Sequence, residues 1–222
     1  MANFTAKDIQ TLRERTGVGM MDCKNALVES DGDMDAAVEI LRKKGIATAA
    51  KKAGRIASQG IVHSYIHMGG KIGVLVEINC ETDFVANNAD FREFANNVAL
   101  QICSMKPQYV AISDVPADVV EHEKAIYREK ALNDPKPKPA AIIEKMLDGQ
   151  IAKFFKEICL LEQEYFRDDS KTINQLLVEI TQTIGEKISI RRFTRYEMGE
   201  GLEKKVDNFV DEINASVASM QK

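Results

Sequence analysis

A segment of strict period-two alternation constrains the fold of this chain most. Residues 72–78 carry a β-branched side chain at every even position, which predicts a strand with one buried face. Residues 60–67 before it are rich in β-branched and aromatic side chains, and Gly69-Gly70 between the two segments is typical of a two-residue hairpin turn. Helical patterns lie on both sides of this hairpin. The chain is therefore expected to be an α+β protein with an antiparallel sheet.

Residues 187–198 predict a further strand that returns to the hairpin, and glycines at 199 and 201 end it. Strict alternation would place Ile188, Ile190 and Arg192 on one face of this strand. Phe193 would then lie on the other face with Ser189 and Arg191.

The N-terminal segment predicts three short helices. The first begins at Thr5, which can form a capping box with Asp8. The second spans about 20–30, and Asp33 caps a third that is expected to stop at Gly45. A core formed by three such helices is very small. It is better suited to docking than to housing a reaction.

Further helices are expected from about 88, over 116–133, over 140–163 with a possible break at Gly149, over 172–185 and in the C-terminal tail. The proline run at 134–139 predicts a turn that makes an antiparallel hairpin of its flanking helices. The expected division is a three-helix N-terminal domain (1–45), a basic linker (46–59), a core hairpin and helix (60–115), a helical hairpin (116–166), a core completion (167–200) and a C-terminal helical module (201–222).

The charge balance argues against nucleic acid as the main partner. Lys and Arg number 30 and Asp and Glu number 34, which gives a net charge of −4. Residues 42–55 hold six basic and no acidic side chains. This connector lacks interleaved aromatic residues, so a solvated linker or exposed helix is favoured over an RNA-binding patch.

The chain is expected to be cytoplasmic. Charged residues interrupt any secretory signal at the N-terminus, and no apolar run approaches the ~20 residues that span a bilayer. The four cysteines are scattered without a Cys-x-x-Cys pair. They are expected to be reduced and mostly buried.

Motifs for catalysis or metal binding are incomplete. Residues 31–35 resemble the start of an EF-hand loop, but Ala36 stands where glycine is required and Arg42 where a glutamate should bind. His63 and His67 could share a strand face near Cys80, which leaves zinc as a weak alternative. No phosphate-binding loop and no nucleophile elbow occur. We therefore expect no catalytic residue, no metal site and no cofactor.

Residues 79–86 (Asn-Cys-Glu-Thr-Asp-Phe-Val-Ala) place an acid and an aromatic side chain just beyond the buried strand, and they resemble the signature loop of the elongation factor Ts family. Five other blocks resemble segments of that family in the same order: 12–24, with Val18 where alanine is commoner, 51–55, 158–163, 168–172 and 191–201. Six ordered blocks across nearly the whole chain are far more specific than any one of them.

The resemblance implies a ubiquitin-associated-like N-terminal domain, an α+β core with one copy of the core motif, an antiparallel helical hairpin and a C-terminal helix. It implies a guanine-nucleotide exchange factor that binds elongation factor Tu in its GDP-bound and nucleotide-free forms. The factor would perturb the Mg²⁺ site and switch region of that partner, so that GDP leaves and GTP can bind. Compact members resemble halves that pair, so a homodimer is implied, with no membrane, nucleic acid or small-molecule substrate.

The resemblance also implies the contact residues. In the family's loop, the matching positions are Thr82, Asp83, Phe84 and Val85. Phe84 would insert as a wedge between helices of the partner, and Asp83 would help to move the elements that order its Mg²⁺ shell. The C-terminal helix would be a further clamp, and the remaining contacts match Arg13, Met20, Met21, Ile184 and Gly185.

Two other functions remain open at this level. A helical adaptor would bind its partners through residues 1–45 alone, whereas an exchange factor needs the core as well. A small hydrolase or metal enzyme would use His63, His67 and Cys80. Neither alternative explains the ordered series of blocks.

Overall fold

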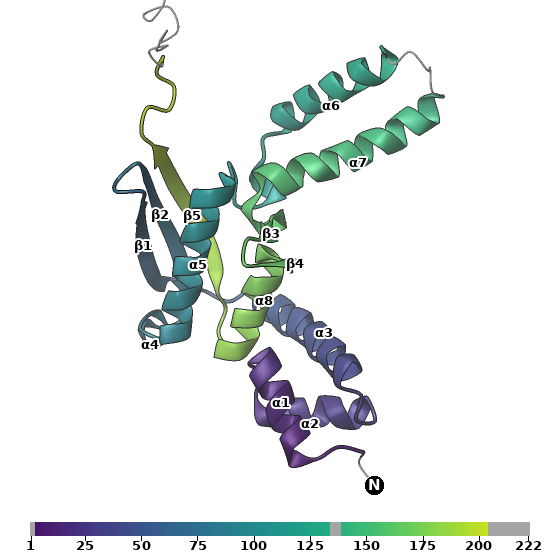
Figure 1. The fold of residues 1–222 in the computed structure, drawn as a ribbon, viewed down its shortest axis with the longest axis vertical. Helices are drawn as coiled ribbons and strands as arrows, with labels where there is room; N and C mark the ends of the chain where they lie inside the picture. Colours follow the sequence, from purple (N-terminus) through teal and green to yellow (C-terminus); the bar gives the residue numbers. More distant parts are fainter. Residues whose placement is uncertain (1–2, 134–138, 204–222) are drawn as a thin grey trace, which may run out of the picture.

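The computed structural model describes residues 3–133 and 139–203, and it confirms the expected α+β class (Figure 1). A three-stranded sheet with helices on one side forms the centre, an N-terminal helical domain lies below it, and a helical hairpin projects from it. The proline-rich turn at 134–138 and the expected helix beyond 203 lie outside the described residues.

The three N-terminal helices form where the sequence predicts them: α1 (Ala6–Thr16), α2 (Met20–Glu29) and α3 (Met34–Lys52). Thr5 and Asp8 form the expected reciprocal capping box, and Asp33 accepts hydrogen bonds from the first backbone amides of α3. Leu12, Leu27 and other apolar side chains bury themselves between the helices and form a small separate core.

The expected end of α3 at Gly45 is wrong. The helix continues to Lys52, so most of the basic segment is helical. Gly45 is buried inside α3 where this helix crosses α8 (Ile173–Ile184), and a Cβ built there would clash with Oε1 of Gln182. Glycine at this position therefore allows two helices to approach closely.

The sheet has the strand order β1 (Gln59–His67), β2 (Ile72–Cys80), β5 (Ser189–Glu197), with antiparallel neighbours. The predicted hairpin and returning strand are thus confirmed. The predicted two-residue turn is not, because His67 pairs with Ile72 and residues 68–71 connect the strands. Met68, Gly69 and Gly70 all have positive φ values in this connection, which two glycines make possible.

A β-bulge in β5 corrects the predicted alternation. Glu77 pairs with Arg192 while its neighbour Ile78 pairs with Ile190, so Arg191 is the extra residue. The expected placement of Ile190 and Arg192 on one face is therefore wrong. Ile190 is buried in the core and Phe193 packs against the same core, because the bulge shifts the alternation by one residue.

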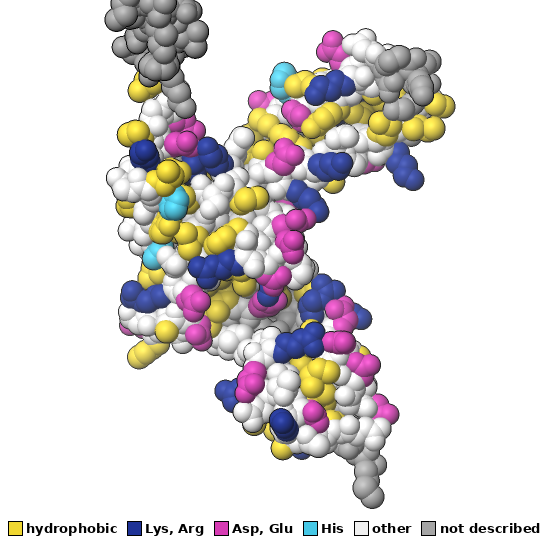
Figure 2. Space-filling view, viewed as in Figure 1, with side chains coloured by type: hydrophobic (Ala, Val, Ile, Leu, Met, Phe, Trp, Pro, Cys, Tyr) yellow, Lys and Arg dark blue, Asp and Glu magenta, His cyan; other side chains and the backbone are white. Residues whose placement is uncertain are grey.

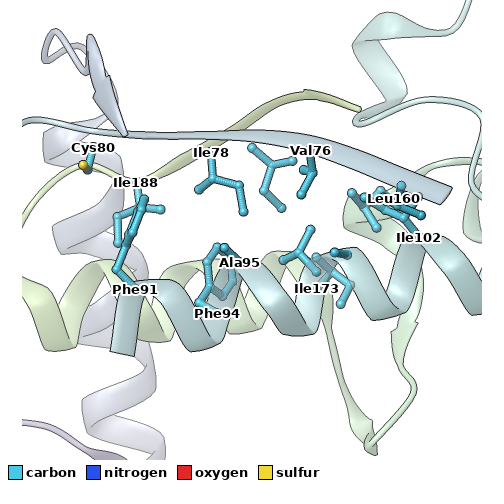
Figure 3. Packing of buried hydrophobic residues seen from close by; sticks show 14 of the residues in the cluster. Val76, Ile78, Cys80, Phe91, Phe94, Ala95, Ile102, Leu160, Ile173 and Ile188 are labelled. Carbon is cyan, nitrogen blue, oxygen red and sulfur yellow. The ribbon is translucent and has the colours of Figure 1, made fainter. Parts of the chain in front are cut away.

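The main core lies between the sheet and the helix α5 (Ala89–Met105), and α8 packs beside α5 (Figures 1 and 3). Asn88 caps α5 through two backbone amides. The predicted apolar stripe of this helix is confirmed: its buried members include Phe91, Phe94, Ala95, Val98 and Ile102. Figure 3 shows Phe94 and Ala95 on the side of α5 that faces Val76 and Ile78 of β2.

The helical hairpin consists of α6 (Ala117–Leu132) and α7 (Ala140–Ile158), which lie side by side away from the sheet (Figure 1). Helix α7 does not break at Gly149, and it ends at Ile158 instead of 163. Short elements absent from the prediction flank the hairpin and α8. They are η1 (Ile112–Asp114), η2 (Leu160–Glu162), β3 (Glu164–Tyr165) and β4 (Asp168–Thr172).

Candidate functional site

The loop after β2 contains a short helix, α4 (Asp83–Ala86), that the sequence did not predict. Thr82 is its N-cap, because its hydroxyl oxygen accepts a hydrogen bond from the backbone N–H of Val85 at 3.4 Å. At the other end, the backbone N–H of Asn87 donates to the carbonyl groups of Asp83 and Phe84. These local bonds give the loop a defined shape.

The four loop residues divide into two exposed and two internal ones. The Phe84 side chain is 85% exposed, and Asp83 is also exposed. Val85 packs against the main core, and the next residue, Ala86, is buried within it. Hydrophobic atoms protrude in Figure 2 where Figure 1 places α4. A large apolar ring so exposed on a charged surface is informative, since such residues often mark interaction sites.

A carboxylate from the connection between α8 and β5 holds the base of this loop. Glu186 accepts hydrogen bonds from the backbone N–H groups of Glu81 at 3.1 Å and Thr82 at 3.0 Å. Its other oxygen accepts the hydroxyl of Thr82 at 2.7 Å. The loop is therefore fixed to a segment more than a hundred residues away in sequence.

The acid that precedes the loop makes the reciprocal contact. Glu81 accepts the backbone N–H of Lys187 at 2.6 Å and pairs with Arg55 at 3.2 Å. The hydrogen bond from Lys187, and then the guanidinium of Arg55, hold the pKa of Glu81 below its ordinary value. The thiol of Cys80 lies at the end of β2, and burial raises its pKa. That thiol is therefore a poor nucleophile.

A cleft of about 630 Å³ lies between the N-terminal domain and the core. Arg13 and Met20 line it from the N-terminal domain, while Asp90 and Thr183 line it from α5 and α8. Two of the predicted contact residues thus share a cleft with the last turn of α8. Met21 is 65% exposed but does not line this cleft.

The remaining predicted contacts lie at the end of α8, between this cleft and the loop. Ile184 is half-buried and packs against the main core, whereas Gly185 is exposed and ends α8 in the left-handed conformation with φ 83°. Glu186 follows directly and holds the α4 loop. The α8–β5 connection is therefore the structural link between the loop and the N-terminal contacts.

The residues of the alternative metal site are not assembled. His67 forms a hydrogen bond with the hydroxyl of Tyr65, and Cys80 pairs in register with Gln59 at the opposite end of β1. Eight residues of strand separate positions 59 and 67, which is about 26 Å. Within residues 3–133 and 139–203, no group of three His, Cys, Asp or Glu side chains could hold a metal ion.

The visible surface carries interspersed acidic and basic side chains over the N-terminal domain and the core (Figure 2). The basic side chains at the end of α3 are partly committed to internal contacts. Lys52 donates to the carbonyl oxygen of Gly185, and Arg55 pairs with Glu81. None of the helices in the described part of the chain is long and apolar enough to cross a membrane.

Comparisons with known proteins identify the family of this chain. The family model described as Elongation factor TS matches residues 20–200. The chain belongs to the elongation factor Ts family. It is 59% identical to the elongation factor Ts of Desulfitobacterium hafniense over 96% of this chain and 97% of the relative. It is also 58% identical to that of Desulforamulus reducens, over 98% of this chain and 99% of the relative.

Two residues that support the α4 loop were not anticipated from the sequence. Glu81 and Glu186 are absent from the predicted site, although each lies next to a predicted contact. Their only sequence signal is an acid beside the loop and an acid beside Gly185. Nothing in the linear order indicates that they reach toward each other.

Proposed function

We propose that this chain is the guanine-nucleotide exchange factor of elongation factor Tu. The single observation that supports this most is the Phe84 ring, which is 85% exposed on a capped, anchored loop that matches the family's signature. The factor binds the GDP-bound partner, disturbs its Mg²⁺ site and switch region, and promotes release of GDP. GTP then binds to the nucleotide-free partner.

The exposed half of the loop makes the functional contacts in this mechanism. Phe84 inserts between helices of the partner, and the carboxylate of Asp83 displaces elements that order the Mg²⁺ shell. Losing the metal ion removes the main charge that neutralises the nucleotide phosphates, so GDP dissociates faster. Thr82 and Val85 belong to the same site, but their internal bonds and packing suit them to holding the loop.

The magnitude of the effect requires more than one contact. Burying a phenylalanine contributes ~1.5–3 kcal/mol, and each tenfold in rate needs ~1.4 kcal/mol. Phe84 therefore accounts for roughly ten- to hundredfold acceleration. Larger effects draw on Arg13, Met20, Met21, Ile184 and Gly185, and on the C-terminal segment as a further clamp.

A homodimer is the assembly we favour, with the uncovered face of the sheet as the interface. This face presents Val62, Ile66, Leu75 and Tyr196, each at least 48% exposed. No helix among residues 3–133 and 139–203 packs over it, whereas α5 covers the other face (Figure 1). Two copies of this face can pair around a two-fold axis.

The proposed function needs no chemistry of its own. The factor changes the affinity of its partner for GDP without a catalytic residue, a cofactor or a small-molecule substrate. Thermodynamic linkage makes the effect reciprocal: GDP lowers the affinity of the partner for this chain by the same ratio by which this chain lowers its affinity for GDP. Such a protein acts in the cytoplasm, together with its partner.

The test replaces Phe84 by alanine and measures release of fluorescent GDP from elongation factor Tu. We expect an unchanged fold, because Phe84 lies outside the core, and a release rate at saturating factor lowered by roughly ten- to hundredfold. Leu132→Ala is the matched control, since this side chain is 67% exposed at the end of α6. Full stimulation by Phe84→Ala would exclude the loop as the site.

A further inference from the structure

Two short segments that are far apart in the sequence cross beside α4. Glu186 accepts three hydrogen bonds from residues that precede Phe84. The donors are the backbone N–H groups of Glu81 and Thr82 and the hydroxyl of Thr82. Glu81 in turn accepts the backbone N–H of Lys187. We call Glu81 and Glu186 the crossed pair, because each carboxylate binds the backbone next to the other.

The crossed pair is built from strong bonds. Hydrogen bonds to an ionised carboxylate are shorter and roughly twice as strong as neutral ones. Two neighbouring negative charges are unfavourable, and the arrangement offsets this with the donors on Glu186 and with Arg55 beside Glu81. Both residues are partly buried, so solvent screens these contacts incompletely.

Buried residues anchor both segments to the core. Cys80 and Ala86 flank the loop, and both belong to the core. Ile188 follows the other segment and is 5% exposed. Figure 3 shows Cys80 and Ile188 at the same end of the core, next to Phe91. Glu186 therefore joins the α4 loop to a segment that is anchored in the core.

The bonds of Thr82 show how Glu186 acts on the loop. The hydroxyl of Thr82 donates to Glu186 and accepts from the backbone N–H of Val85, so a single rotamer satisfies both roles. The second bond caps α4, a helix of four residues that is too short to be stable alone. Removing Glu186 would free the hydroxyl and leave two backbone N–H groups without their acceptor.

We propose that Glu186 is a positioning residue that keeps the α4 loop in the conformation presenting Asp83 and Phe84. The proposal rests on the proposed exchange function. Glu186 acts through the loop, because its three bonds are internal to the chain. Preorganising a binding loop raises affinity by removing the cost of ordering it on contact.

The proposal predicts a separation of two kinetic parameters. In Glu186→Ala only a fraction of the molecules holds the competent loop, so the apparent affinity for the partner falls by that fraction. The partner selects the competent loop at saturation, and the maximal rate of GDP release is retained. We expect the half-saturating concentration to rise by about tenfold or more, since losing even one charge-assisted hydrogen bond has an effect of about this size.

The experiment has one readout without the partner and one with it. Hydrogen exchange of the backbone N–H groups of Val85 and Asn87 in the full-length free chain reports α4, and exchange in α5 reports the fold. Stopped-flow release of fluorescent GDP from elongation factor Tu over a range of factor concentrations reports affinity and maximal rate. Glu186→Gln keeps an acceptor for the two backbone donors, so its values should lie nearer to wild type than those of Glu186→Ala.

Glu179→Ala is the control for loss of a carboxylate, since Glu179 lies on α8 and pairs with Lys171. The proposal is supported if Glu186→Ala alone speeds exchange in α4, leaves α5 protected and raises the half-saturating concentration. Unchanged exchange in α4 would overturn it, as would a lowered maximal rate with an intact α4, which would mean direct contact with the partner. If the wild-type chain does not accelerate GDP release from elongation factor Tu, the nucleotide-exchange function is refuted. The hydrogen-exchange measurement would still test whether Glu186 holds the α4 loop.

Discussion

Single residues in this chain show how local surroundings decide what a side chain does. Glu77 lies on the uncovered face of the sheet, where the bulge in β5 turns both Arg191 and Arg192 toward it at 2.7 Å. The hydrogen bond from Arg191, followed by that from Arg192, lowers the pKa of Glu77 from 4.5 to about 2. One carboxylate thereby ties two neighbouring strands together.

This contact predicts a pH dependence of stability. The pKa of Glu77 is lower in the folded chain than in the unfolded one, so the unfolded chain binds more protons between pH 4.5 and about 2. The stabilisation is present above pH 4.5 and is lost as the pH falls toward 2. We expect Glu77→Gln to lower stability at neutral pH and to flatten its decline over this range, measured by urea unfolding.

The control for this prediction is Glu200→Gln, on the exposed turn after β5. It should keep the wild-type decline between pH 4.5 and 2. If Glu77→Gln loses stability with acid as steeply as the wild type, the two arginines do not lower the pKa of Glu77.

At the scale of elements, two glycines inside helices have opposite surroundings. Gly45 lies in α3 where Gln182 of α8 approaches, whereas a Cβ at Gly149 in α7 would meet nothing within 4 Å. Glycine normally destabilises a helix interior by about 0.5–1 kcal/mol relative to alanine. Packing between α3 and α8 therefore explains Gly45, while nothing in the structure explains Gly149.

The two glycines give a paired prediction for thermal unfolding. Gly149→Ala should stabilise the chain by about 0.5–1 kcal/mol, because alanine has the higher helix propensity. Gly45→Ala should gain less or destabilise, since the side chain of Gln182 must move. Adding Gln182→Ala to Gly45→Ala should restore the stability that Gly45→Ala fails to gain relative to Gly149→Ala. Equal gains at both glycines would show that the close approach of α3 and α8 is unimportant.

At the scale of the whole molecule, α3 connects the N-terminal domain with the core. Its last turn carries Lys52, which donates to Gly185, and Arg55 beyond it pairs with Glu81. The side chain of Lys187 completes the contact through the carbonyl oxygens of Ala53 and Arg55. A fragment of residues 1–45 would cut α3 in its middle, so it is a poor test of the adaptor alternative.

The proposed homodimer predicts that one charge on the uncovered sheet face disrupts self-association. Leu75 lies in the central strand and is 48% exposed, so each copy would bury about half of this side chain on pairing. Because two-fold symmetry counts the change twice, Leu75→Lys should weaken self-association by roughly ten- to hundredfold or more. Sedimentation velocity at micromolar concentration measures this.

Val28→Lys on α2 is the control, since Val28 is 59% exposed outside the sheet. It should sediment like the wild type. A wild-type chain that sediments as a monomer would refute the homodimer, and a Leu75→Lys chain that remains dimeric would place the interface elsewhere.

The sequence alone determined the elements whose signals are local. The predicted caps Thr5 and Asp33 begin α1 and α3, because an N-cap needs only backbone amides two or three residues away. The helix starts expected near 88 and 172 are also correct, and there the structure adds Asn88 and Thr172 as caps. The alternation over 72–78 identifies the central strand, because the period of two is set by the backbone of the strand itself. The family motif predicts residues 82–85 as the contact loop, and the structure adds that the ring of Phe84 is exposed.

Tertiary structure decided what depends on a distant partner. Gly45 lies inside α3 instead of ending it, and glycine is needed there because α8 fills the space beside it. Arg191 is the extra residue of a β-bulge, because β5 pairs with β2 while Ile190 and Phe193 both face the core. Glu186 holds the α4 loop only because folding brings it next to residues more than a hundred positions away. Local patterns carry no record of such contacts, since their energy arises only when separate elements pack together.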